Sequence, residues 1–485
     1  MKLFKCQKLC VLVMALLFFG CFMLPFTSGR KTDVNNFGNI PNIKISSSTN
    51  AIYQLLIVAP KVFIDELEPL VCHKQRMGIS TRLVTLDEIY HQMYWHGRDQ
   101  AEKIKYYIKT AIEEWGIKYV LLVGGKKGQL PFWYVPVRYL HMANDWESEI
   151  LSDLYYADIY DAAGNFSTWD SDGDGDYGEW IYGETPEDIN IDLTADVAVG
   201  RLPCRNEYEV SIMVDKIITY ETKTWGQSWF NRMVVAAGDT YPESHNPNWT
   251  GYEGEYYGDQ ALENMTGFFP VRLYTSSGTL TGFRDVQKAV NPGCGFLYFV
   301  GHGSPKQWGN NNPNGTGFVH ALSTTNVHRL NNNNRYPVCV LSGCHNLQFD
   351  VNIFRNFNKT LRYRQEGVFE CLGWRLTRVV RGGSIATLGA TALGFTKEDK
   401  HAFIGGINEL EVAFFEQYGT YGQHILGDAW RGAINWYTTT YPINWLSSDP
   451  VYLSDAWIDV QVPATWILFG DPSLLVGGYQ PLLLP

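Results

Sequence analysis

The chain has 485 residues, which is enough for one large domain or for two to three ordinary ones. Hydrophobic residues make up 45% of it and aromatic residues 14%, so it can form a packed core and is not an intrinsically disordered protein. The net charge of -11 at pH 7 argues against general nucleic-acid binding and fits a soluble acidic protein.

Residues 1–29 have the features of an export signal: early lysines, a hydrophobic run and small residues at the end. The alternative is a lipoprotein, with the lipid attached to Cys21. Residues 30–50 are polar and are expected to be a flexible leader. No later segment reaches the length of apolar sequence that spans a bilayer, so no membrane span is expected after signal removal. The mature protein is therefore expected to be secreted or extracytoplasmic.

Strands and helices alternate after the leader. This alternation is typical of a parallel sheet with right-handed crossovers. In the first half, the sequence predicts strands over 53–59, 80–85, 119–125 and 197–201, and helices over 64–77, 100–115 and 207–222.

The same pattern restarts near residue 226, so we expect an α/β protein with two subdomains, 51–225 and 226–478, that share one catalytic unit. Segments 241–258 and 331–334 are rich in Pro, Gly or Asn and are expected to be surface loops. In the second half, the sequence predicts strands over 233–238, 296–300, 337–341 and 384–389, and helices over 257–265, 283–290, 408–418 and 429–437.

Two of the expected strands run into a reactive residue flanked by glycine. Residues 296–300 lead to His302, and residues 337–341 lead to Cys344. If the two strands lie side by side and parallel, both side chains emerge at the same carboxyl edge, where open α/β sheets have their sites. A thiol and an imidazole placed in this way are a nucleophile and its base. The alternative, a buried cysteine and a loop histidine, stays open on these residues alone.

An acidic segment lies in the first half of the chain, from Asp170 to Glu179. Carboxylates that are so close in sequence repel one another unless a cation offsets their charge, and Ca²⁺ prefers several hard oxygen ligands on a turning loop. The segment begins like an EF-hand loop but has Ile181 where that loop has a bidentate Glu. We expect a structural Ca²⁺ site and no organic cofactor; the alternative is a solvated acidic turn. The expected ligands are Asp170, Asp172, Asp174, Asp176 and Glu179.

Several longer motifs accompany the His and Cys blocks. They are YVLLVG at 119–124, SD at 152–153, VGRL at 199–202, WG at 308–309 and WILFGDPSLL at 466–475. Together they span about residues 53–476, and in this order the chain resembles the gingipain family of cysteine peptidases, within the caspase-like group.

This resemblance implies a caspase-like three-layer α/β/α fold with a mainly parallel sheet. It also implies a secreted cysteine endopeptidase that acts on protein or peptide substrates. By the same resemblance, Cys344 is the nucleophile, His302 is the general base and acid, and Asp196 orients the imidazole. The residue preferred at the P1 position stays open.

In this mechanism Cys344 attacks the scissile carbonyl and forms an acyl-enzyme, which water then releases. The backbone N–H groups of Gly303 and Cys344 are expected to bind the oxyanion. Trp308, Thr391 and Phe395 are candidate walls of the substrate pocket.

Two other functions stay open. One is a catalytically inactive, calcium-stabilised surface or binding protein with the same fold. The other is a transpeptidase that uses the same acyl-enzyme and transfers it to an amine instead of water.

Overall fold

The structure is a computed structural model that describes residues 53–243, 251–354, 367–398 and 403–481. The expected signal (1–29), the lipid-bearing alternative at Cys21 and the leader (30–50) lie outside these residues. Within the described part of the chain, no helix is both long and apolar enough to cross a membrane.

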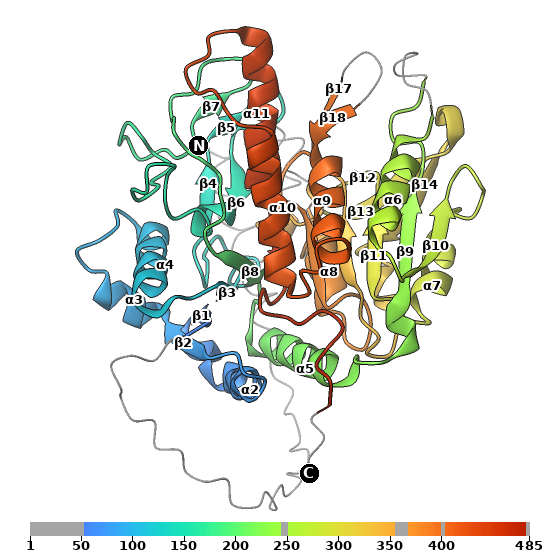
Figure 1. Ribbon diagram of the computed structural model, residues 1–485, viewed down its shortest axis with the longest axis horizontal. Helices are drawn as coiled ribbons and strands as arrows, with labels where there is room; N and C mark the ends of the chain where they lie inside the picture. The colour runs from blue at the N-terminus through green and yellow to red at the C-terminus, as the bar shows by residue number, and fades with distance from the viewer. Residues whose placement is uncertain (1–52, 244–250, 355–366, 399–402, 482–485) are drawn as a thin grey trace, which may run out of the picture. The chain divides into compact units, whose positions relative to one another are not determined.

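In the part of the chain that the structure describes, ten strands form one sheet (Figure 1), and all neighbouring strands run parallel except β16 and β19. In spatial order the strands are β10 (Phe269–Tyr274), β9 (Arg232–Ala237), β11 (Phe296–Phe299), β15 (Val338–Leu341), β16 (Ala386–Ala390), β19 (Trp466–Phe469), β8 (Ala198–Leu202), β3 (Tyr119–Val123), β1 (Leu55–Ala59) and β2 (Thr81–Thr85). The central strands are buried along their whole length, which explains why they are continuous apolar runs.

Helices cover both faces of the sheet. On one face α2 packs on α5 and α5 on α8; on the other, α6, α9 and α10 lie side by side, with α11 beside α10 (Figure 1). This is the expected three-layer α/β/α arrangement. The helices are α2 (Ile64–Arg76), α3 (Leu86–Gln92), α4 (Gln100–Trp115), α5 (Glu207–Lys223), α6 (Glu253–Asn264), α7 (Phe283–Val290), α8 (Leu372–Arg378), α9 (Ile407–Gly419), α10 (Leu426–Thr440) and α11 (Pro450–Thr465).

Helix α4 shows how local sequence sets these bounds. At its start the Asp99 side chain accepts the backbone N–H of Glu102, which is a standard N-cap. At its end Gly116 adopts φ 69°, a left-handed conformation that glycine reaches without strain. Ile104 and Ile108, one turn apart, are fully buried, so the helix packs on the sheet through one face.

Among the described residues, four shorter sheets lie outside the main sheet. The first consists of β12 (His302–Gly303), β13 (Gln307–Asn311) and β14 (Phe318–Ser323) and is antiparallel. The others pair β4 (Arg138–Leu140) with β6 (Ile150–Ser152), β5 (Met142–Ala143) with β7 (Trp180–Ile181), and β17 (Thr396–Glu398) with β18 (Phe403–Gly406).

The expected loop at 241–258 was wrong in its last part, because α6 begins at Glu253. The division into subdomains 51–225 and 226–478 stays a prediction. In the sheet itself, strands from both halves meet where β8 pairs with β19.

Several of the family-like motifs have structural roles. Arg201 of the VGRL motif forms a bidentate pair with Asp153 of the SD motif at 2.7 Å, with both side chains buried. Lys74 lies 2.8 Å from Glu221 and 2.6 Å from Asp471, which belongs to the closing motif. These buried ion pairs join distant parts of the chain, and removing one partner would leave an uncompensated charge in the interior.

Candidate active site

The carboxyl ends of four neighbouring parallel strands, β9, β11, β15 and β16, meet at one edge of the sheet. Strands β11 and β15 are adjacent and parallel, as the sequence predicted. One residue lies three positions beyond the end of each of these four strands, at this same edge. These residues are Thr240, His302, Cys344 and Leu393.

The His and Cys segments touch through their main chains. Gly343 has φ 125°, and a Cβ at this position would lie 2.6 Å from Gly303 N and 2.9 Å from His302 C. A residue with a side chain has no room here and would also be strained. The glycine before Cys344 therefore permits the close approach that brings the two segments together.

The His302 ring is held by the loop after β9. Its Nε2 lies 2.8 Å from the Thr240 carbonyl oxygen. A carbonyl only accepts, so Nε2 donates, and in the neutral ring the basic lone pair is on Nδ1. The ring edge also contacts Tyr241, with centroids 6.0 Å apart. Thr240 is a contact that the sequence reasoning missed.

The Thr240 loop is itself fixed by buried neighbours. Asn310, which is fully buried on β13, donates to Thr240 Oγ1 at 3.1 Å and to the Val300 carbonyl at 2.8 Å. Gly254, at the start of α6, lies so close that a Cβ on it would be 2.6 Å from Thr240 Oγ1. This packing fixes the carbonyl that accepts from His302.

Cys344 is half-buried, and its Sγ accepts the backbone N–H of Gly394 at 3.4 Å. Burial raises the pKa of the Cys344 thiol above its usual value of 9.0, and the negative charge of Glu147 adds to this, while the Gly394 N–H acts in the opposite direction. These surroundings therefore favour the thiol form of the Cys344 side chain over the thiolate. Attack on a carbonyl carbon then needs a base to take its proton.

Asp196, expected to orient His302, has other partners. Its carboxylate accepts the backbone N–H groups of Ile159 at 2.7 Å and Tyr160 at 2.9 Å, just before β8. In the structure, the ring of His302 is held by the Thr240 carbonyl oxygen, which accepts from Nε2. The role of Asp196 stays a prediction that these contacts do not support.

The three candidate pocket walls have different surroundings. Trp308 is fully buried and packs on Phe299, with ring centroids 4.8 Å apart, so it is a core residue and does not line an open pocket. Thr391 is buried, and its hydroxyl donates to the Leu151 carbonyl at 2.6 Å. Phe395 is half-buried and directly follows Gly394, whose N–H contacts the sulfur, and its ring packs on Trp457 with centroids 5.5 Å apart, so its role as a pocket wall stays a prediction.

Within the described residues, the acidic segment and its neighbours form three overlapping groups of possible metal ligands. In each group the ligand atoms all lie within 4.8 Å of one another. The sequence reasoning missed three members, because they lie outside the segment. Among the described residues, Asp174 belongs to none of the groups. The groups are Asp170, Asp172 and Asp188; Asp172, Glu179 and Glu187; and His141, Asp176 and Glu179.

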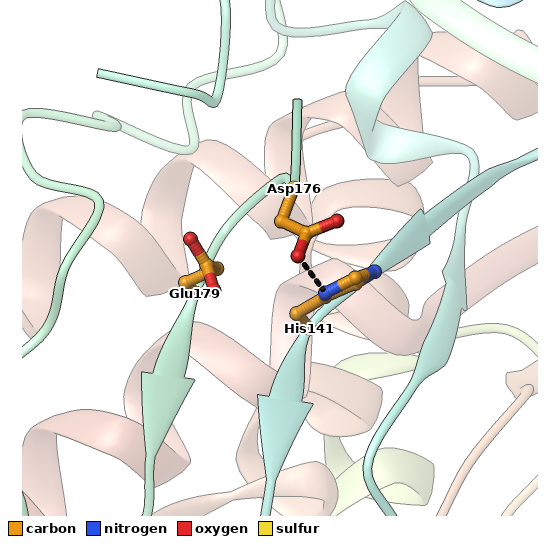
Figure 2. Close-up of side chains that lie close together, drawn as sticks. All are labelled: His141, Asp176 and Glu179. Carbon is orange, nitrogen blue, oxygen red and sulfur yellow. Dashed lines mark ion pairs between the residues drawn. The ribbon is translucent and has the colours of Figure 1, made fainter. Parts of the chain in front are cut away.

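The third group is shown in Figure 2, where Glu179 and Asp176 lie near the His141 ring and the Asp176 carboxylate is 3.3 Å from Nδ1. Burial, followed by repulsion from Asp174, Glu187 and other neighbouring carboxylates, raises the pKa of Glu179 to about 7. A cation would relieve this repulsion, and the carboxylate oxygens are hard donors of the kind that Ca²⁺ takes. These clusters could therefore bind a metal.

Comparison with known proteins identifies the family. A protein-family model described as peptidase family C25 matches residues 48–477, which is most of the chain. The chain belongs to peptidase family C25. This is a family of cysteine-type endopeptidases, and the match confirms the gingipain resemblance.

Curated C25 relatives are distant and longer. The chain is 21% identical over 435 residues to gingipain R2 of Porphyromonas gingivalis, a match that covers 88% of this chain and 46% of the relative. It is 25% identical over 220 residues to Lys-gingipain HG66 of the same organism, covering 45% of this chain and 11% of the relative. The chain thus spans less than half the length of these relatives.

Two solved structures share the C25 fold with this chain. The Arg specific cysteine proteinase gingipain R (RGPB) matches with a TM-score of 0.58 and 17% identity, over 89% of this chain and 79% of that one. The complex of Porphyromonas gingivalis RgpB pro- and mature domains matches with a TM-score of 0.55 and 18% identity, over 87% and 79% of the two chains. The expected caspase-like fold is therefore confirmed.

Proposed function

We propose that this C25 family member is a cysteine endopeptidase with Cys344 as nucleophile and His302 as general base and acid. One observation carries the proposal. The two residues follow adjacent parallel strands, and their segments touch where Gly343 meets the His302–Gly303 peptide. A thiol and an imidazole held in this way are the two groups that covalent peptide hydrolysis requires.

The reaction proceeds by acyl transfer. His302 Nδ1 takes the proton of the Cys344 thiol as Sγ attacks the scissile carbonyl carbon. The C–N bond then breaks, and the imidazolium gives its proton to the departing amine, which leaves a thioester. Water attacks the thioester with His302 as base, releasing the acid and restoring the thiol.

Main-chain groups stabilise the two charges that form in this mechanism, one on the oxyanion and one on the His302 imidazolium. The N–H groups of Gly303 and Cys344 bind the oxyanion, and losing one such donor typically costs about a hundredfold or more in rate. The Thr240 carbonyl accepts from His302 Nε2 and keeps the ring turned so that Nδ1 is the basic nitrogen. It also stabilises the imidazolium that forms during attack.

The proposed substrates are proteins or peptides, and Phe395 is the proposed pocket wall. Some relatives are named for Arg or for Lys, and these names describe those proteins only. For this chain the P1 preference is to be measured. Export through residues 1–29 is part of the proposal and would bring the enzyme to proteins outside the cytoplasm.

A structural Ca²⁺ is the proposed resident ion. Of the three ligand groups, the two without histidine suit it, because Ca²⁺ prefers oxygen donors. Asp188 is buried and Glu179 has a raised pKa, so the oxygens of these two would gain most from a bound cation. The ion would stabilise the loop and take no part in thiol attack.

A peptide library tests the proposal. The purified wild-type protein should cleave a subset of peptides that share one P1 residue type, while Cys344→Ala and His302→Ala should cleave none. Adding EGTA should lower the melting temperature of the protein, whereas the initial rate of peptide cleavage should change little. Cleavage that persists in Cys344→Ala, or no cleavage by the wild type, would contradict the assignment.

A further inference from the structure

A buried carboxylate from the first half of the chain reaches the segments that flank the nucleophile. Glu147 lies in the loop between β5 and β6 and is 5% exposed. The loop is closed by Asn144, whose side-chain oxygen accepts the Glu147 N–H at 3.1 Å and whose own N–H donates to the Glu147 carbonyl at 2.8 Å. This turn fixes the point from which the Glu147 side chain starts.

The Glu147 carboxylate contacts two segments at once. Its Oε1 accepts the backbone N–H of Leu393, after β16, at 2.9 Å. Its Oε2 lies 3.6 Å from Nε2 of His345, the buried residue directly after Cys344. Glu147 therefore joins the chain beyond β16 to the chain beyond β15.

The Leu393 peptide is held from its other side by α11. The fully buried Gln461 donates from Nε2 to the Leu393 carbonyl at 2.6 Å. Both main-chain polar groups of Leu393 are thus bound by side chains from distant parts of the sequence. The next N–H along, that of Gly394, is the one that points at Cys344 Sγ.

We propose that Glu147 is a positioning residue for the peptidase reaction: with Gln461 it clamps Leu393, so that the Gly394 N–H stays directed at the Cys344 sulfur. The kinetic consequence rests on the proposed function. The clamp itself also governs how Cys344 reacts with simple electrophiles, and that reaction needs no substrate.

The two contributions of Glu147 have opposite effects on the sulfur. Its negative charge disfavours the thiolate, while the N–H that it helps to position favours the thiolate. Glu147→Gln keeps an oxygen that can accept from Leu393 and removes the charge. Gln461→Ala keeps the charge and removes one side of the clamp. The two variants therefore separate the clamp from the charge.

The first measurement is the rate of Cys344 alkylation by iodoacetamide as a function of pH, followed by peptide mass spectrometry. The exposed Cys72 serves as the reference thiol within each sample. We expect the midpoint of the profile to move to lower pH in Glu147→Gln and to higher pH in Gln461→Ala. Asp145→Asn, which removes an exposed charge from the same loop, should leave the midpoint unchanged.

The second measurement is steady-state hydrolysis of the best peptide. Glu147→Ala should lower kcat by about ten- to a hundredfold with KM nearly unchanged, the effect expected when a catalytic group is displaced by about 1 Å. Glu147→Gln should recover most of that loss. Melting temperatures of all variants identify any that fail to fold, and Glu147→Gln, which is isosteric, keeps the test valid if the alanine variant does not fold.

Wild-type kcat in Glu147→Ala, or midpoints that move in the same direction in Glu147→Gln and Gln461→Ala, would overturn the inference. If the wild type hydrolyses no peptide, the proposed function fails, and the alkylation profiles still decide the clamp. If the wild type is active and the profiles of all variants coincide, the clamp alone is wrong.

Discussion

Gly343→Ala should impair catalysis through one definite collision. The new Cβ would lie 2.6 Å from Gly303 N, whereas ordinary contacts of a Cβ begin at 3.4 Å. The His302 segment must therefore move by roughly 1 Å, a displacement that can cost about a hundredfold in rate. We expect kcat/KM for peptide hydrolysis to fall by about this factor, and the alkylation rate of Cys344 to change as well.

The control for Gly343→Ala separates collision from backbone strain. Gly278 has φ 68°, also in the left-handed region, but a Cβ there would meet nothing within 4 Å. Gly278→Ala should thus lose some stability and keep its activity. The reasoning would be refuted if Gly343→Ala kept wild-type kcat/KM, or if both variants lost activity to the same extent.

Three further predictions follow from the same contacts. Asn310→Ala removes the donor that holds Thr240, so kcat should fall about tenfold with KM unchanged in steady-state assays. Trp308→Ala empties a fully buried site beside Phe299 and should cost about 3–5 kcal/mol in urea unfolding. The pKa of Glu179 is raised to about 7 in the folded state, so the folded carboxyl keeps a proton that the unfolded one releases. In EGTA, stability should therefore fall as pH rises from about 5 to about 7.5, and Glu179→Gln should reduce that slope. Wild-type kcat in Asn310→Ala would contradict the first prediction. A loss in the free energy of unfolding smaller than this in Trp308→Ala would contradict the second, and an unchanged slope of stability against pH in Glu179→Gln would contradict the third.

Much of the sheet could be predicted from the sequence, because its strands are apolar runs bounded by turn residues. Of the ten strands that the described residues contribute to this sheet, eight were expected, and the two exceptions have identifiable causes. Strand β10 is an edge strand that is exposed at three of its six residues and contains Pro270, so its pattern is not that of a buried strand. Strand β19 follows α11 with no intervening turn, so no punctuation marks its start.

The candidate site was predicted only in part. His302 and Cys344 were proposed because each follows an apolar run and lies beside glycine, a signal that is local in sequence, and the structure places both at the same sheet edge. Thr240 occupies the matching position after β9, and the same rule of strand ends would have found it once β9 was known to lie beside β11. A main-chain carbonyl, however, leaves no signature of residue type.

Glu147 could not have been found from its neighbours in sequence. Its contacts with Leu393 and His345 join residues some two hundred positions apart, and they depend on how the β5–β6 loop packs on the sheet edge. Similarly, the Asp188 and His141 members of the acidic groups lie outside the run of carboxylates that suggested a Ca²⁺ site. Packing between distant parts of the chain determines which residues make these contacts, and it cannot be read from the local composition of the sequence.

The most direct test of the central claim is labelling by a peptidyl electrophile that mimics a cleaved sequence, with the modified residue identified by mass spectrometry. We predict that the wild type is labelled at Cys344 much faster than at the exposed Cys72, and that His302→Ala abolishes this preference. Equal labelling of the two cysteines in the wild type, or an undiminished preference in His302→Ala, would contradict the assignment of Cys344 and His302 as nucleophile and base.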